Sequence, residues 1–81
     1  MQIPMLVFAA ARQSLGKSQL LVTLAPGSSV RDLRSEVLRL HPELEGLLKF
    51  SRFAIQTEYV TEDTELRDGV EIAWIPPVSG G

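Results

Sequence analysis

The chain ends in VEIAWIPPVSGG (Val70–Gly81), an apolar run that two prolines interrupt. Residues 70–75 have the apolar, β-branched and aromatic content of a buried strand. Pro76 and Pro77 fix φ and lack backbone N–H donors, so a strand ladder cannot continue through them. We therefore predict a final strand that stops at the prolines and, over residues 76–81, an extended tail that leaves the sheet.

The predicted tail combines stiffness, reach and an unshielded end. Two prolines favour a polyproline II course, in which six residues reach at most about 20 Å. Glycines have no Cβ, so a narrow channel can close around the last two residues, and we expect Gly81 to carry a free carboxylate. The residues that would thread such a channel before it are Gly80, Ser79, Val78, Pro77 and Pro76. The alternative is a disordered end or a cloning remnant, which is the commoner meaning of Gly-Gly alone.

The length, composition and net charge are those of one small globular domain. The chain has 81 residues, 44% of them hydrophobic and 22% charged, with a net charge of −2. Its longest apolar run falls short of the roughly 20 residues of a membrane-spanning helix, and its start lacks the features of a signal peptide. We expect a cytoplasmic protein without membrane contact. The mildly acidic balance argues against nucleic-acid binding, which depends on neutralising phosphates.

Few side chains are available for catalysis. The chain has no cysteine and one histidine, His41, which excludes disulfides, thiolate nucleophiles and most metal sites built from Cys or His. No Ser/His/acid or Cys/His set can form, so we predict no autonomous catalysis, no metal and no bound cofactor. Gly16-Lys17-Ser18 resembles the end of a phosphate-binding loop, but Ala11 stands where that pattern has its first glycine, and a strand-like run follows where the pattern has a helix. We therefore do not expect nucleotide binding at this turn.

The N-terminal part predicts a hairpin and then a helix. Gln2–Ala10 is typical of a strand buried on both faces, with its pairing confined to the residues after Pro4; Arg12–Lys17 predicts a turn and Gln19–Leu24 a second strand. Ser28 or Ser29 is the expected helix N-cap, and Ser29 with Asp32 resembles a capping box. The apolar stripe expected to face the sheet is Val30, Leu33, Val37 and Leu40. The polar side expected to face water is Arg31, Arg34, Ser35 and Arg39.

The remaining segments complete a sheet. Residues 42–48 predict a short second helix, Arg52–Gln56 a strand, and Tyr59 with Val60 a short extended piece before turns over Thr61–Gly69. The order is strand, strand, helix, strand, strand, and the apolar first and last strands are expected side by side at the centre. This order predicts the α+β β-grasp, or ubiquitin-like, fold, a mixed sheet with one main helix packed across it. We expect a β-grasp domain over residues 1–75 and an extended tail over 76–81.

The terminal carboxylate makes chemical sense as a substrate. A carboxylate is inert toward nucleophiles until one oxygen becomes part of a leaving group, and joining it to AMP achieves this. The adenylated carbonyl of Gly81 could then be attacked by an amine, giving a conjugate, or by a sulfur nucleophile, giving a thiocarboxylate. Because the chain has no cysteine, any sulfur that it carries must lie on Gly81 itself.

Three segments carry a family resemblance. They are Leu6–Ala9 followed by Arg12, Pro26-Gly27 before the helix start at Val30–Leu33, and Leu66–Gly81. Over essentially its whole length the sequence resembles the small subunits of molybdopterin synthase, a family of ubiquitin-like sulfur carriers. The Pro-Pro-Val-Ser-Gly-Gly ending is specific to that family, whereas Gly-Gly alone is not.

The resemblance implies a non-catalytic subunit that donates sulfur in molybdenum cofactor biosynthesis. A ubiquitin-activating-like adenylyltransferase would use ATP to adenylate Gly81, which is then converted to a thiocarboxylate. The tail would enter the active site of a large subunit, which transfers the sulfur to a cyclic pyranopterin monophosphate, and two small subunits would flank a large-subunit dimer. Family docking surfaces are apolar, and the matching positions here are Phe8, Tyr59 and Ile75.

Other functions remain open at this point. A related carrier could serve thiamine or another thio-compound pathway with the same terminus. A ubiquitin-like modifier would form isopeptide bonds to lysines, and covalent ladders in cell extract would reveal it. A non-covalent β-grasp interaction module would be indifferent to the loss of Gly80 and Gly81.

Overall fold

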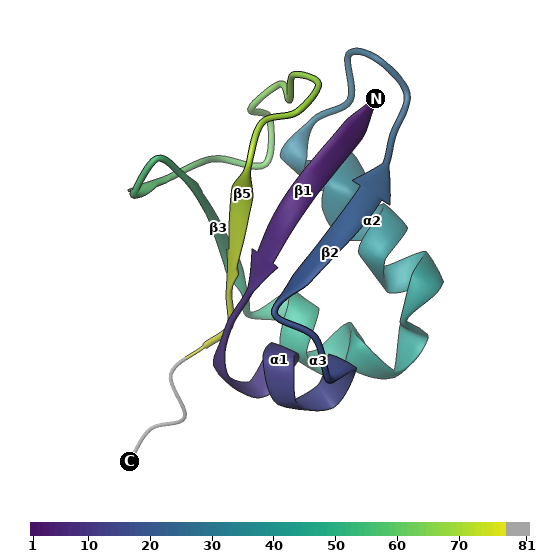
Figure 1. Ribbon diagram of the computed structural model, residues 1–81, viewed down its shortest axis with the longest axis vertical. Coiled ribbons are helices and arrows are strands. Elements are labelled where there is room, and N and C mark those ends of the chain that lie inside the picture. Colours follow the sequence, from purple (N-terminus) through teal and green to yellow (C-terminus); the bar gives the residue numbers. More distant parts are fainter. Residues whose placement is uncertain (78–81) are drawn as a thin grey trace.

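The first and last strands lie side by side at the centre of a five-stranded mixed sheet (Figure 1). The computed structural model describes residues 1–77. The strands are β1 (Gln2–Val7), β2 (Gln19–Thr23), β3 (Arg52–Ile55), β4 (Glu58–Tyr59) and β5 (Ile72–Ile75), in the spatial order β2-β1-β5-β3-β4. β1 and β5 are parallel, and the other neighbouring strands are antiparallel. The β-grasp prediction, with its central first and last strands, is confirmed.

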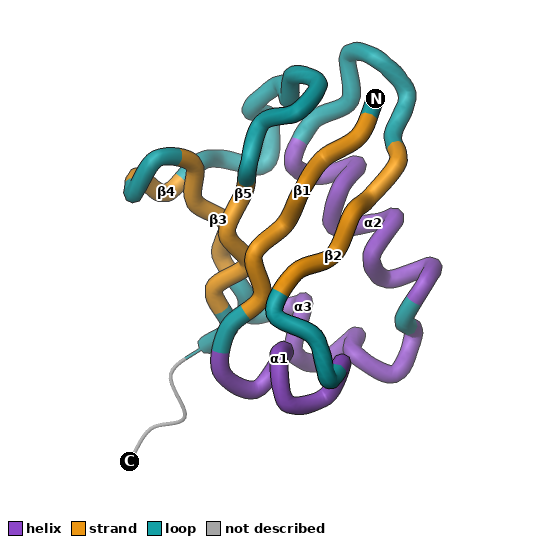
Figure 2. The backbone as a smooth tube through the Cα atoms, viewed as in Figure 1, coloured by secondary structure: helices purple, strands orange, loops and turns teal. Residues whose placement is uncertain are grey.

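The helices cover only one face of this sheet. α2 (Val30–Leu40) and α3 (Glu45–Lys49) pass behind the strands in Figure 2, while α1 (Ala9–Leu15) closes one end. Alternate residues of the central strands face the helices and are fully buried: Ile3, Met5, Val7, Ile72 and Trp74. The other face of β1 is only half-buried, at Pro4 and Leu6. The prediction that β1 is buried on both faces was therefore wrong, because a single layer of helices leaves one face open.

Pro4 does not delay the pairing of β1, contrary to the sequence-based prediction. The register with β2 begins at Gln2, opposite Thr23, and runs through Pro4. The Gln2 N–H donates to Asp68 Oδ1 and its carbonyl accepts from the Gly69 N–H, so Gln2 directs its backbone groups toward the β5 side. Two residues on, the missing N–H of Pro4 falls on that same side, and the ladder with β2 stays intact.

Residues 9–15 form the helix α1, where a strand end and a turn were predicted. Ala9 turns the chain with a positive φ of 50°, and Ala10 and Ala11 follow it; alanine has the highest intrinsic helix propensity. Gly16 ends it in the left-handed region, with φ 69° and its N–H bonded to the Arg12 carbonyl. Ala11 is fully buried, so α1 also closes one end of the core. Local propensity and packing together outweigh the apolar continuity of the strand.

The start of α2 follows the sequence closely. Ser29 is the N-cap, and a capping box forms as predicted, with the Ser29 N–H 2.8 Å from Asp32 Oδ2 and the Asp32 N–H 3.4 Å from Ser29 Oγ. Val30, Leu33 and Val37 are buried against the sheet. Leu40 was expected in the same stripe but is 48% exposed, because α2 ends there and its last turn projects past β2 (Figure 1).

Arg34 does not face water as predicted. Its guanidinium donates to Glu62 Oε1 at 2.7 Å, to the Ser51 carbonyl at 3.0 Å and to the Leu48 carbonyl, and it lies 4.9 Å from the Phe53 ring centroid. These contacts tie α2 to α3, to the segment that follows α3 and to the loop after β4. A short second helical segment was predicted here, and it is present as the 3₁₀ turn η1 (Pro42–Leu44) continuing into α3.

β5 ends at Ile75, where the predicted tail begins. Pro76 is buried and Pro77 is exposed, and residues 78–81 lie outside the described residues, so the division into a body and a tail remains a prediction. Within residues 1–77, no helix is long and apolar enough to cross a membrane. Over the same range, no three His, Cys, Asp or Glu side chains gather where they could hold a metal ion.

Candidate functional site: an apolar groove where the last strand ends

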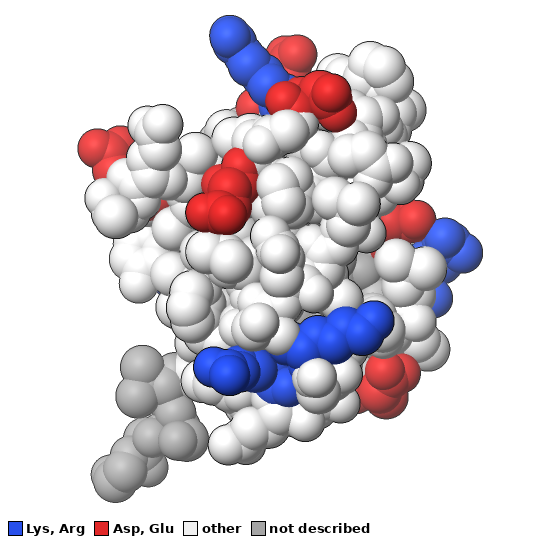
Figure 3. Space-filling view, in the orientation of Figure 1, with Lys and Arg blue, Asp and Glu red and all other residues white. Residues whose placement is uncertain are grey.

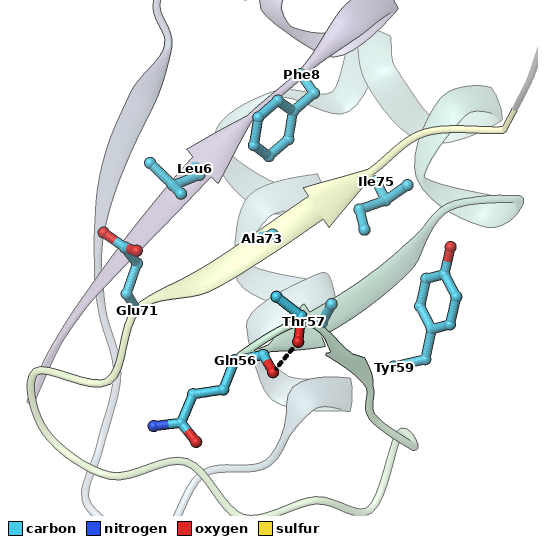
Figure 4. A pocket seen from close by; sticks show the side chains of 9 residues that line it. Leu6, Phe8, Gln56, Thr57, Tyr59, Glu71, Ala73 and Ile75 are labelled. Atoms are coloured by element: carbon cyan, nitrogen blue, oxygen red, sulfur yellow. Dashed lines mark hydrogen bonds between the residues drawn. The ribbon is translucent and has the colours of Figure 1, made fainter.

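The helix-free face of the sheet carries an apolar groove (Figure 4). The register places Leu6 of β1 opposite Ala73 of β5, Ala73 opposite Ala54 of β3, and Ala54 opposite Tyr59 of β4. Two alanines in the middle of this row leave a hollow between the larger side chains at its ends. This open-face groove encloses about 460 Å³ and is lined by Leu6, Phe8, Ala54, Gln56, Thr57, Tyr59, Glu71, Ala73 and Ile75.

Phe8 and Ile75 lie at the end of the groove where β5 stops. Phe8 keeps an extended backbone, with φ −125° and ψ 161°, so its side chain follows Leu6 on the open face before α1 begins at Ala9. It is 45% exposed, although it is a large apolar side chain. Ile75 follows Ala73 on the same face and is half-buried. A partner that covers this end of the groove would therefore remove substantial apolar surface from water.

Tyr59 forms the opposite wall and is held by a cation. The Arg52 guanidinium lies 3.8 Å from the centroid of the Tyr59 ring, within the range of a cation–π interaction. Tyr59 is 55% exposed, so one side of the ring remains free. A ring that is already oriented loses little conformational entropy when a partner packs against it.

A strained two-residue turn places Tyr59. Gln56 and Thr57 connect β3 to β4 with φ values of 50° and 65°, the left-handed pattern of a type I′ hairpin turn. Neither is a glycine or asparagine, and Thr57 is β-branched, so the conformation is costly. The Thr57 hydroxyl donates to the Gln56 carbonyl at 2.5 Å, as drawn in Figure 4. The turn aligns β4 with β3 and so fixes the wall of the groove.

The structure brings together three of the residues that the sequence singled out. Phe8, Tyr59 and Ile75 come from different parts of the chain, and all three line the open-face groove. Of the predicted tail-threading residues, Pro76 and Pro77 follow Ile75 directly, while Val78, Ser79, Gly80 and Gly81 lie outside the described residues. The roles assigned to all of these residues remain predictions.

Sequence reasoning missed the residues that form the floor of the groove. Leu6, Ala54 and Ala73 were not singled out, yet their register creates the hollow. The available signal was the spacing of two, since Leu6 precedes Phe8 and Ala73 precedes Ile75 by two positions on a strand. That spacing places each pair on one face without saying which strands are neighbours.

Comparison with known proteins identifies the family. The model of the ThiS family matches residues 5–81. The molybdopterin synthase sulfur carrier subunit of Chlamydomonas reinhardtii is 41% identical over 83 residues, covering 100% of both chains. The chain belongs to the ThiS family, among the molybdopterin synthase sulfur carrier subunits. The resemblance seen in the sequence is confirmed, and with it a place in molybdenum cofactor biosynthesis as a carrier subunit that is not an enzyme on its own.

Solved structures share the fold along nearly the whole chain. The putative molybdopterin converting factor subunit 1 of Pyrococcus furiosus superposes with a TM-score of 0.85 at 28% identity, covering 96% of this carrier and 99% of that chain. SAMP1 of Haloferax volcanii also gives a TM-score of 0.85, at 24% identity and with full coverage of both chains. At that identity the second likeness concerns the β-grasp fold alone.

Proposed function

We propose that Gly81 carries the sulfur as a C-terminal thiocarboxylate, and that the open-face groove docks the carrier on the proteins that load and unload it. The observation that carries this proposal is the position of Phe8, Tyr59 and Ile75 on one apolar groove, at whose end β5 stops and the chain continues into Pro76. A partner that covers the groove therefore also receives the chain where it leaves the sheet.

Loading requires activation of the Gly81 carboxylate. One carboxylate oxygen attacks the α-phosphorus of ATP on an adenylyltransferase, pyrophosphate leaves, and a glycyl adenylate forms. Hydrosulfide supplied by the sulfur donor then attacks the carbonyl carbon and AMP leaves, which gives the thiocarboxylate. The carrier supplies the reacting carbonyl, and the partner supplies ATP and the catalytic groups.

Unloading takes place in the large subunit of molybdopterin synthase. The tail enters its active site, and the thiocarboxylate sulfur forms a bond to a carbon of the pyranopterin precursor. Water then cleaves the bond between that sulfur and the Gly81 carbonyl carbon, so the sulfur stays on the precursor and Gly81 returns to a carboxylate. Two carriers flank a large-subunit dimer in the proposed assembly, which works in the cytoplasm without contact to nucleic acid or membrane. The carrier itself binds no cofactor in this scheme.

The groove has the composition of a docking surface. Aromatic residues are over-represented among the residues that dominate binding energies, and a few such anchors in a desolvated centre account for most of an interface. Phe8 and Tyr59 are large, exposed and positioned by their backbones, whereas the charged residues Glu71 and Arg52 lie near its two ends. In this proposal, docking depends on the open-face groove, and sulfur transfer depends on the tail.

A reconstituted system separates these two roles. We would compare the intact carrier, a carrier that ends at Ser79, and a Phe8→Asp variant for large-subunit binding and for molybdopterin formation. The truncated carrier should bind and yield no molybdopterin, while Phe8→Asp should remain folded and bind poorly. Molybdopterin formation by the truncated carrier would contradict the role of Gly81. Covalent ladders on lysines of other proteins would instead indicate a modifier.

A further inference from the structure

We propose that cations around the end of β5 form a positively charged rim that meets an acidic surface on the carrier's protein partners. This rim consists of Arg12, Lys17 and Arg52. The inference rests on the proposed function, because it concerns the same docking event. It adds the charge of the partner, which the apolar groove alone does not specify.

The charges of these cations are not neutralised by ion pairs within residues 1–77. Three other arginines form ion pairs, Arg31 with Asp63, Arg34 with Glu62 and Arg39 with Glu36. Among residues 1–77, no carboxylate lies within ion-pair distance of Arg12, Lys17 or Arg52. The guanidinium of Arg52 contacts the Tyr59 ring instead, and that contact leaves its charge available to a partner.

The fold gathers the three cations at one end of the molecule. Arg12 and Lys17 flank a shallow hollow beside the C-terminal end of α1, where Gly16 turns the chain toward β2. Figure 3 shows Lys and Arg side chains across this end of the open face, over α1 and beneath the ends of β1 and β2. Arg52 pairs with Ile75, the last residue of β5. The rim therefore lies around the position from which the chain continues into Pro76.

Two acidic residues, Glu71 and Asp68, lie toward the other end of the sheet. Glu71 lines the open-face groove on the side away from Ile75 (Figure 4). Asp68 bonds the Gln2 N–H, at 2.7 Å, where β1 begins. Because the chain as a whole has a net charge of −2, the positive end reflects how charges are distributed and not an overall excess. The positive end is thus the end of the sheet at which β5 stops.

An acidic protein surface fits this rim better than a nucleic acid does. Nucleic-acid binding depends on many phosphate contacts, and three cations on an acidic protein provide few. Charges at the edge of an interface mainly accelerate encounter and orient the partners, while the apolar centre holds the complex together. The rim would orient the carrier so that its tail faces the partner's active-site entrance.

Association kinetics with the large subunit test the rim. We would measure the association rate constant of wild type and of an Arg12→Gln/Lys17→Gln double variant by stopped flow, from about 0.02 to 0.5 M salt, a range over which screening becomes strong. Arg52 stays unchanged because it positions Tyr59. The double variant should associate about 5- to 20-fold more slowly at low salt and converge with wild type at high salt.

A matched variant controls for the overall charge. The double variant Arg31→Gln/Arg67→Gln also removes two positive charges, but at positions outside the rim. Its association rate constant should stay within about twofold of the wild-type value. Equal rates and equal salt dependence for wild type and the rim variant would overturn the inference, as would an equal loss in the control. Failure of the thiocarboxylated wild type to transfer sulfur would overturn the proposed function instead, so the two failures are distinguishable.

Discussion

Truncation of Phe8 to alanine shows how much the open-face groove contributes to docking. Phe8 is 45% exposed in the free carrier. A phenylalanine side chain offers about 200 Å² for burial, so roughly 90 Å² of it remains for a partner to cover. At about 25 cal/mol per Å², covering that area is worth about 2 kcal/mol, which corresponds to a roughly 30-fold weaker Kd for the variant. The fold should be little affected, since much of the side chain lies outside the core.

Calorimetric titration of the large subunit with Phe8→Ala measures this loss. Phe50→Ala is the matched control, because Phe50 is 64% exposed, caps the end of α3 and does not line the groove. The control should bind as wild type does, and thermal unfolding should show that both variants are folded. An unchanged Kd for Phe8→Ala, or an equal loss for Phe50→Ala, would refute the assignment of the groove as the docking surface.

Three further changes test separate parts of the account. Arg34→Met removes the contacts of Arg34 with Glu62 and two carbonyls and should lower the free energy of unfolding by about 2 kcal/mol, whereas Arg31→Met, at an exposed ion pair, should leave it nearly unchanged. Equal effects in chemical denaturation would contradict a special role for Arg34. Thr57→Gly relieves a left-handed φ and should raise the free energy of unfolding by about 1 kcal/mol, so a lower melting temperature would count against strain in this turn. Gly81→Ala and a one-residue extension after Gly81 should leave unfolding unchanged but impair adenylation or sulfur transfer, and normal product yields with both would exclude a narrow channel.

The parts of the fold that were predicted correctly have local or strongly periodic signals. The capping box at Ser29 and Asp32 involves residues three positions apart, so no tertiary information is needed to recognise it. The apolar first and last strands indicated their central places, because the middle of a sheet buries the most surface. The places of the other strands, including the short β4, depend on the connections between strands, which the sequence constrains less strongly.

The missed features depend on contacts between distant residues or on competing local preferences. Arg34 lies on the polar side of α2 by periodicity, and only the packing of α3 and the loop after β4 brings partners to it. Residues 9–15 combine an apolar run, which suggested a strand, with alanines that favour a helix. The turn at Gln56 and Thr57 lacks the Asn-Gly signal of a type I′ turn, although its geometry is the same.

The candidate site was predictable only in part. Phe8, Tyr59 and Ile75 were found through a family resemblance, whereas the hollow between them comes from the register of Ala54 and Ala73. Register depends on tertiary pairing, which single-strand patterns do not define. The cationic rim likewise appears only after α1 has carried Arg12 and Lys17 to the end of the sheet at which β5 stops.

The central claim is that Gly81 carries the sulfur, and intact-mass spectrometry tests it most directly. The carrier would be co-expressed with an adenylyltransferase and a sulfur donor, and fragmentation would locate any modification. Our account predicts replacement of one terminal oxygen by sulfur on Gly81. An unmodified Gly81, under conditions in which the same enzyme loads a related carrier, would contradict it.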